Sequence, residues 1–172
     1  MKKGFTLVEL LVVIAIISIL TIITVSQFQT AKKKANDVAR KGDLSALSKA
    51  LLMYYTDYGF FPKSNAAGQI VVADNPPATR IIAWGGSFTD NAATPYTYMK
   101  VMPIEKPTMP GYCYVTDANG TKFSLFAQLE TTTDSQCSTN GAVNVYHHCG
   151  HNYCFAYVSP NAVVSDFPPS VP

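Results

Sequence analysis

Charged residues and catalytic motifs are scarce in this 172-residue chain, and its first third lacks proline. No proline occurs before Pro62, so nothing breaks a helix in the first third of the sequence. Charged residues make up 14% and hydrophobic residues 48%, a balance that excludes a disordered chain. No G-x-S-x-G, H-E-x-x-H or P-loop sequence is present, and no pair of carboxylates stands out. We therefore expect one ordinary domain with a small attachment, and no enzyme.

The few charges are unevenly placed. Between residues 32 and 49, two acids accompany six basic residues, namely Lys32, Lys33, Lys34, Arg40, Lys41 and Lys49. From residue 50 onward, eight acidic residues outnumber five basic ones. A basic belt next to an apolar segment is typical of contact with anionic lipid headgroups. Nucleic-acid binding is disfavoured, because the rest of the chain is acidic and the belt has no interleaved aromatic residues.

The longest apolar run begins almost at the start of the sequence. Of the 21 residues from Phe5 to Val25, 16 are apolar, and a helix of that length spans ~30 Å, the thickness of a bilayer core. The run is too long for a secretory signal and is followed by no small-residue cleavage site. Lysines flank it on both sides, so charge counting leaves its orientation open. We expect a transmembrane helix.

One carboxylate, Glu9, lies within this run. An acid in the first turn of a helix is favoured by the helix dipole and can reach the headgroups, so a simple anchor could also carry it. In a packed bundle of helices the same group would need a cation, since burying an unpaired charge costs several kcal/mol. An ionisable group in a membrane segment is by default a functional hypothesis, and we interpret Glu9 as an assembly residue.

The stretch "KGFTLVELLVVIAIISIL" resembles the N-terminus of type IV prepilins and type II secretion pseudopilins. The resemblance implies cleavage by a prepilin peptidase between Gly4 and Phe5, N-methylation of Phe5, and a salt bridge between Glu9 and the Phe5 amine of a neighbouring copy. It also implies a cytoplasmic N-terminus, an exported body, and a cell-surface or extracellular filament after assembly in the inner membrane. The implied partners are other copies of the chain, the peptidase, an assembly ATPase and a platform protein. Many pilins carry a proline within this helix, and this chain does not.

The remaining chain predicts an α+β, pilin-like fold. Leu44, Leu47, Leu51, Tyr54 and Tyr58 form one apolar helix face that ends near Gly59 and Pro62, so one long helix is expected, its first half in the membrane and its second half packed on a small antiparallel sheet. The segment "YCYVTDANGTKFSLFAQLE" predicts a hairpin, and a second is predicted around His151-Asn152. The expected parts are a leader (1–4), a membrane and assembly helix (5–25), its amphipathic continuation (26–61), an irregular connection (62–110), a disulfide-bearing sheet (111–160) and a tail (161–172).

Four cysteines, Cys113, Cys137, Cys149 and Cys154, favour two disulfides in an exported body. If His151-Asn152 is a two-residue turn, Cys149 faces Cys154, which predicts Cys149–Cys154 with Cys113–Cys137. The alternative is Cys113–Cys154 with Cys137–Cys149.

The stretch "HHCGHNYC" also contains potential zinc ligands, but its spacing matches no standard zinc site. Oxygens of Asp117, Asn119 and Asp134 could in principle bind calcium, although turn geometry explains Asp117 and Asn119 adequately. We predict no metal and no cofactor. The sequence thus favours a type IV pilin. The alternatives are a secretion pseudopilin or, in a different class, a singly anchored exported binding module that holds zinc through His147, His148, His151 and the cysteines.

Overall fold

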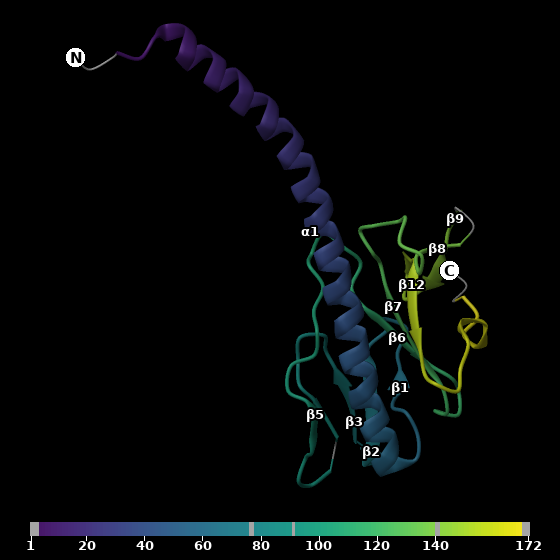
Figure 1. Cartoon of the computed structure of the whole chain (residues 1–172). Coiled ribbons are helices and arrows are strands. Elements are labelled where there is room, and N and C mark those ends of the chain that lie inside the picture. Colours follow the sequence, from purple (N-terminus) through teal and green to yellow (C-terminus); the bar gives the residue numbers. More distant parts are fainter. Residues whose placement is uncertain (1–3, 76–77, 91, 140–141, 170–172) are drawn as a thin grey trace. The chain divides into compact units, whose positions relative to one another are not determined.

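The computed structural model describes residues 4–75, 78–90, 92–139 and 142–169 (Figure 1). Residues 1–3 of the expected leader and 170–172 of the expected tail lie outside this range. The chain divides into two compact units, residues 1–36 and 37–172, here called the N-terminal unit and the body. A single helix, α1 (Leu7–Tyr58), contributes residues to both. The predicted long helix is confirmed, and it runs without interruption up to the glycine and proline that were expected to end it.

The body is an α+β structure built from short antiparallel strands (Figure 1). Its main sheet has the order β12-β7-β6, with β7 in the centre, and a second three-stranded sheet has the order β1-β2-β3. The remaining strands form the two-stranded pairs β4-β5, β8-β9 and β10-β11. The elements are β1 (Lys63–Ser64), β2 (Ile70–Asn75), β3 (Ala78–Ile82), β4 (Phe88–Thr89), β5 (Thr97–Met99), β6 (Cys113–Thr116), β7 (Phe123–Ala127), β8 (Ser138–Thr139), β9 (Ala142–Val143), β10 (Tyr146–His148), β11 (His151–Tyr153), β12 (Phe155–Val158) and the 3₁₀ helix η1 (Val164–Asp166).

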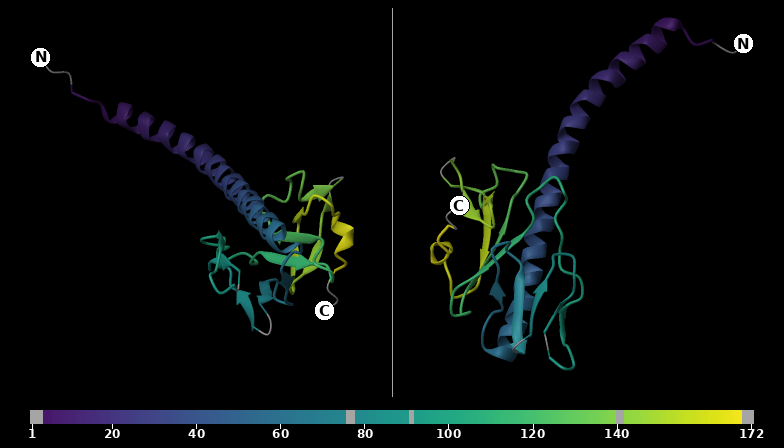
Figure 2. Two further views of the ribbon diagram at one scale, coloured as in Figure 1. Left: turned by 90° about the horizontal axis from the view of Figure 1, so that it is seen from below. Right: turned by 180° about the vertical axis from the view of Figure 1, so that it is seen from behind.

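The apolar face predicted for the second half of α1 is the centre of the core. Leu44, Leu47, Leu51 and Tyr54 are fully buried, and Tyr58 is partly buried. They belong to one core cluster with side chains of both three-stranded sheets, including Ile70 of β2 and Leu125 of β7. Figure 2 shows strands of the body beside the second half of α1. Spacings of three and four residues therefore identified the packing face correctly.

The first predicted hairpin is also confirmed. Strands β6 and β7 pair from Cys113↔Phe126 to Thr116↔Phe123, and the turn contains Gly120 with φ +68°. A side chain at Gly120 would lie 2.9 Å from the Phe61 carbonyl oxygen, whose residue donates its backbone N–H to Gly120 O at 2.7 Å. Glycine is therefore required here both for the turn and for the close approach of the end of α1.

Strand β7 is buried along its whole length, because both faces of the main sheet are covered. Phe126 belongs to a second apolar cluster that also contains Tyr153 and Phe167. Phe167 comes from the C-terminal segment, which was expected to lack regular structure and instead contains η1 and packs on the sheet. Burial raises the pKa of Tyr153 to about 12.

The prediction of an irregular connection over residues 62–110 was wrong in part, because this region contains five of the strands. The hairpin between β1 and β2 is closed by Asn65 and Gln69, whose side chains bond at 2.9 Å, and by Gly68 at φ +71°. Strands of two to six residues that carry Thr, Asn and Ala show little hydrophobic periodicity, and their composition is typical of loops. For this reason the sequence did not predict them.

Candidate assembly site

The start of α1 is fixed by Thr6 and Glu9. The backbone N–H and the hydroxyl of Thr6 both donate to Glu9 Oε2, at 2.8 and 2.7 Å, and the backbone N–H of Glu9 donates to Thr6 Oγ1 at 3.2 Å. A threonine followed three residues later by glutamate is a capping box, which satisfies backbone donors that a helix start leaves unpaired. The carboxylate thus has a structural task within its own chain that the sequence interpretation did not include.

The second carboxylate oxygen, Glu9 Oε1, takes no part in the capping box. Both contacts to the Glu9 carboxylate among the described residues use Oε2. The Glu9 side chain is exposed, as are Gly4 and Phe5, which precede the helix, with 75% of Phe5 accessible. The predicted cleavage and assembly residues therefore lie together at an accessible helix start, with one carboxylate oxygen available to a further donor.

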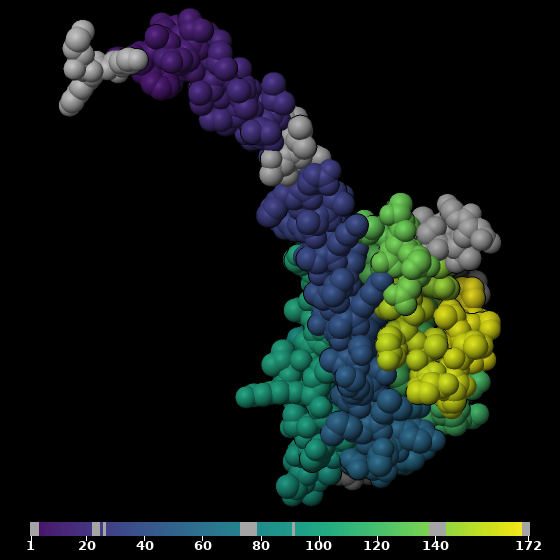
Figure 3. Space-filling view, in the orientation of Figure 1, coloured from purple at the N-terminus to yellow at the C-terminus, as the bar shows by residue number. Residues whose placement is uncertain are grey.

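Large apolar side chains cover the N-terminal unit on every side. Those with about half or more of their surface exposed include Leu7, Val8, Leu10, Leu11, Val12, Ile14, Ile16, Ile17, Ile19, Leu20, Val25 and Phe28. Figure 3 draws this part of the chain in purple and dark blue. The hydroxyls of Ser18 and Thr21 donate back to the carbonyls of Ile14 and Ile17, both at 2.7 Å. These two hydroxyls therefore satisfy their hydrogen bonds within the helix and need no partner from outside it. Within the residues whose placement is described, no helix meets the length and apolarity that a membrane span requires.

A buried ion cluster lies where the body begins. The Arg40 guanidinium bonds Asp37 at 2.8 Å, Glu105 at 2.5 Å and Glu130 at 3.0 Å. Burial works against the charge of Arg40, yet the hydrogen bonds to Glu105 and Glu130 raise the pKa of the guanidinium. The Asp37 carboxylate also accepts the backbone N–H groups of Glu130 at 2.8 Å and Thr131 at 2.9 Å. The cluster ties α1 to two distant loops, and sequence analysis missed it because Arg40 was assigned to the basic belt.

The other basic residues of the belt behave differently. Lys32, Lys33 and Lys34 are exposed, whereas Lys41 forms an ion pair with Asp134 at 2.8 Å. That hydrogen bond lowers the pKa of Asp134. The belt predicted from composition is thus divided: Lys32, Lys33, Lys34 and Lys49 are exposed, whereas Arg40 and Lys41 form ion pairs in the body.

Both disulfide pairings considered for the sequence are wrong. The structure contains Cys113–Cys149 and Cys137–Cys154, so all four cysteines are paired. The error comes from the second hairpin, in which His148 faces His151, so the turn falls at Cys149-Gly150 rather than at His151-Asn152. Cys149 adopts φ +52° in that turn and is directed to Cys113, while Cys154 lies between β11 and β12.

The disulfide at Cys149 explains the need for glycine at position 68. A Cβ on Gly68 would lie 2.3 Å from Cys149 Sγ and 3.0 Å from Cys113 Sγ. The Gly68 carbonyl also accepts the backbone N–H of Tyr114 at 3.0 Å. The β1–β2 turn therefore rests directly on the disulfide, and it links the second sheet to the main one.

The predicted zinc alternative loses its thiol ligands to these disulfides. His147 and His151 are exposed, while His148 is 4% exposed and stacks on Phe126 with ring centroids 4.2 Å apart. Burial and the neighbouring His147 lower the pKa of His148. In the described part of the chain, no three His, Cys, Asp or Glu residues are grouped as metal ligands.

The three oxygen-bearing residues considered for calcium are engaged elsewhere. The Asp117 carboxylate accepts the backbone N–H groups of Thr121 at 2.7 Å and Lys122 at 2.9 Å, and Asn119 is an exposed turn residue. Burial opposes ionisation of Asp117, but these bonds from Lys122 and Thr121 lower its pKa. Asp134 is occupied by Lys41, so these residues stabilise a turn and a helix contact.

Comparison with known proteins agrees with the geometry of the helix start. Residues 1–25 match the family described as the prokaryotic N-terminal methylation motif. The chain therefore carries a prepilin-type N-terminus, the resemblance inferred from its first residues. It is also similar to the type II secretion system core protein G of Pseudomonas aeruginosa strain PAO1, with 26% identity over 126 residues that cover 73% of this chain and 82% of the relative. No solved structure matches the chain.

Proposed function

We propose that this protein is the structural subunit of a pilin-like filament. It is made as a membrane-anchored precursor, cut between Gly4 and Phe5, methylated at Phe5 and polymerised through the N-terminal part of α1. The observation that carries the proposal is a capped helix start bearing Glu9, followed by an apolar surface on all sides, within a matched methylation motif.

The apolar surface must be covered in both states of the subunit. A helix that is hydrophobic all round is stable only when buried in lipid or among similar helices. The precursor uses lipid of the inner membrane, with its N-terminus cytoplasmic and its disulfide-bonded body exported. The assembled subunit uses the helices of neighbouring copies, and the body faces outward at the cell surface.

Glu9 sets the register of that packing. Cleavage before Phe5 creates an α-amine, which is largely protonated at neutral pH because its ordinary pKa is ~8. The Thr6 cap uses Glu9 Oε2, which leaves Glu9 Oε1 as the acceptor that we assign to the amine of the next copy. Lipid and neighbouring helices are similarly apolar, so the polar pair supplies the preference for one axial position.

The proposal requires assembly partners and no catalysis by this chain. Besides other copies, the partners are a prepilin peptidase, an assembly ATPase and an inner-membrane platform protein. The Arg40 cluster and the two disulfides give the body a fixed structure for repeated side-by-side packing.

Two kinds of filament fit this function. The disulfide-bonded body is our reason for placing a type IV pilus first. The similarity to a type II secretion core protein is the specific observation that favours a secretion pseudopilus.

Intact-mass spectrometry of protein sheared from the native cell surface tests the proposal. The expected mass lacks residues 1–4, has one added methyl group and has four fewer hydrogens for the two disulfides. A processed protein that stays in the membrane fraction, with loss of protein secretion on deletion of its gene, would identify the pseudopilus. An unprocessed mass would overturn the proposed function.

A further inference from the structure

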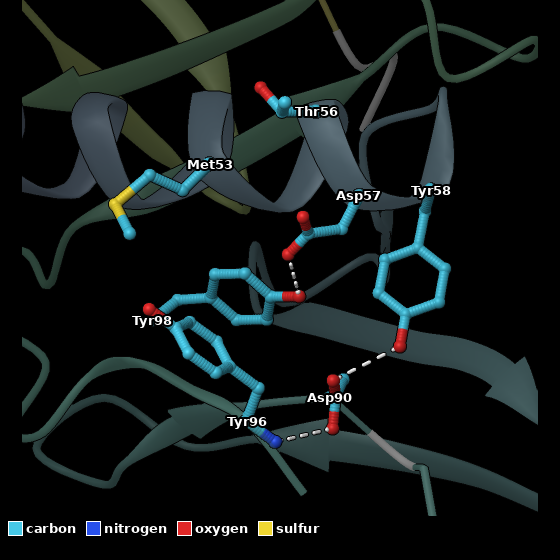
Figure 4. A pocket seen from close by; sticks show the side chains of 7 residues that line it. All are labelled: Met53, Thr56, Asp57, Tyr58, Asp90, Tyr96 and Tyr98. Carbon is cyan, nitrogen blue, oxygen red and sulfur yellow. Dashed lines mark hydrogen bonds between the residues drawn. The ribbon is translucent and has the colours of Figure 1, made fainter.

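A pocket of about 660 Å³ opens in the body beside the last two turns of α1. Its volume lies in the range of small-molecule sites. One wall is formed by α1 and the other by the segment that carries β4 and β5. Figure 4 shows Asp57 and Tyr58 of α1 pointing toward Tyr98 and Asp90 of the opposite wall. The groups that define its chemistry are two carboxylates, Asp57 and Asp90, and three aromatic rings, Tyr58, Tyr96 and Tyr98.

The two walls are joined by reciprocal pairs. Asp57 of α1 accepts the hydroxyl of Tyr98 at 2.8 Å, and Asp90 of the opposite wall accepts the hydroxyl of Tyr58 at 3.0 Å. Asp90 Oδ1 also accepts the backbone N–H of Tyr96 at 2.9 Å. The acids and rings are therefore held in place before any ligand arrives, which reduces the entropy lost on binding.

Negative charge is concentrated in this pocket. In the part of the chain that the structure describes, the ion pairs involve other carboxylates, and the carboxylate oxygens of Asp57 and Asp90 accept from neutral donors. The Arg80 guanidinium donates to the main-chain carbonyl of Asp90 at 2.9 Å and not to its carboxylate. Burial, the hydrogen bond to Asp57 and the charges of both acids raise the pKa of Tyr98. The Tyr98 hydroxyl thus remains a neutral donor, and in the described part of the chain neither carboxylate forms an ion pair.

Aromatic faces complete the wall. The Tyr96 and Tyr98 rings lie 4.9 Å apart, inclined at 65°, and 52% of Tyr96 is exposed. Rings at an angle beside carboxylates attract an organic cation through the negative face of each ring and through direct charge. We propose that this pocket binds an alkylammonium group, placed between Asp57 and Asp90 against the tyrosine rings.

Two sources supply that chemistry. One is a small free amine or quaternary ammonium compound, and the other is a lysine side chain from a second copy of this chain, whose Lys32, Lys33 and Lys34 are exposed. Binding of the free group does not depend on filament formation, so it can be tested on dispersed subunits whatever becomes of the proposed function.

The test is calorimetric titration of the intact chain in maltoside detergent, which contains no ammonium group. The probes are butylammonium, choline and 3,3-dimethylbutan-1-ol, a neutral molecule of the shape of choline. We expect the two cations to bind at about millimolar concentration and the neutral molecule to bind at least ~10-fold more weakly. Raising the salt concentration should weaken the cations alone.

Asp57→Asn retains an acceptor for the Tyr98 hydroxyl and removes one charge. It should weaken cation binding about fivefold or more, without changing the binding of the neutral molecule. The matched control is Asp43→Asn, because Asp43 on α1 also accepts a tyrosine hydroxyl, that of Tyr112 at 2.8 Å, and does not line the pocket. The control should bind as the unaltered chain does.

Carbodiimide cross-linking of assembled subunits then separates the two sources. A linked peptide between Asp57 or Asp90 and a lysine of another copy identifies the intermolecular source. Its absence, with cation binding intact, identifies a free ligand. Equal binding of choline and its neutral counterpart, or no cation binding together with no cross-link, would overturn the proposal. Either result would leave the processing and assembly of the subunit untouched.

Discussion

Replacing Glu9 by glutamine separates the helix-capping role of this side chain from the register role that we propose for it. In the structure, Glu9 completes a capping box with Thr6 through three hydrogen bonds. Glutamine also completes a capping box, so Glu9→Gln preserves the helix start and removes the charge. Thr6→Ala does the reverse, because it removes the cap and keeps the carboxylate.

The expected sizes of the two effects differ enough to be distinguished. In a packed bundle, Glu9→Gln leaves the Phe5 amine of the neighbour without its anion, and an unpaired buried charge costs ~3–5 kcal/mol. A loss of ~3 kcal/mol corresponds to ~150-fold weaker incorporation, since 1.4 kcal/mol is a factor of ten. Loss of the Thr6 cap costs about 1 kcal/mol, or about fivefold.

Incorporation is measured by competition. Each variant is expressed with the unaltered chain at equal precursor levels, and the ratio of the two processed chains in purified filaments is read by mass spectrometry. Both variants should be cut at Gly4, as should Glu9→Ala, which is expected to be excluded like Glu9→Gln. If Glu9→Gln were incorporated within tenfold of the unaltered chain, or Thr6→Ala were excluded as strongly, the register function of Glu9 would be wrong.

Three further predictions concern the stability of the body, each followed by tyrosine circular dichroism of the mature chain in detergent. Arg40→Leu leaves buried carboxylates without their cation and should lower Tm by ~6–15 °C, and a shift below ~2 °C would mean that water screens the cluster. In Gly68→Ala the new Cβ would lie 2.3 Å from Cys149 Sγ, and the free energy of unfolding should decrease by ~2–3 kcal/mol. The control is Gly150→Ala, which should cost ~1 kcal/mol because φ is also positive there but no atom lies within 4 Å. Equal costs would contradict the packing argument. Burial and the neighbouring His147 lower the pKa of His148, so near pH ~6.5 and just below it the unfolded chain binds more protons than the folded chain does. As the pH is lowered from ~6.5, the free energy of unfolding should therefore decrease until the pKa of His148 in the folded chain is reached. His148→Gln should make this decrease smaller.

The structural elements that depend on local sequence pattern could be predicted from the sequence. Leu44, Leu47 and Leu51 lie on one face because helix periodicity fixes them there, and Asn119-Gly120 places the turn of β6 and β7. These features need no knowledge of distant residues. The apolar start with Glu9 was equally readable, and the methylation motif at residues 1–25 agrees with it.

Features that depend on distant contacts were missed. The second hairpin turns at Cys149, a residue type that rarely adopts positive φ, and this shift of two residues exchanged the partners of every cysteine. The Arg40 cluster joins α1 to Glu105 and Glu130, which lie 65 and 90 positions further along the sequence than Arg40. The tyrosine pocket likewise combines α1 with a segment whose composition is that of a loop.

The two disulfides have a mechanical consequence for a filament. The Cys113–Cys149 bond closes a span of 36 positions, and Cys137–Cys154 closes an overlapping span of 17. A fully extended chain gains ~3.4 Å per residue, so the first bond alone withholds ~120 Å of length from a pulling force. Residues 113–149 therefore cannot be drawn out while the first bond is intact. If the chain forms the proposed filament, a pulling force can lengthen the body only through residues outside that span, such as those between α1 and Cys113.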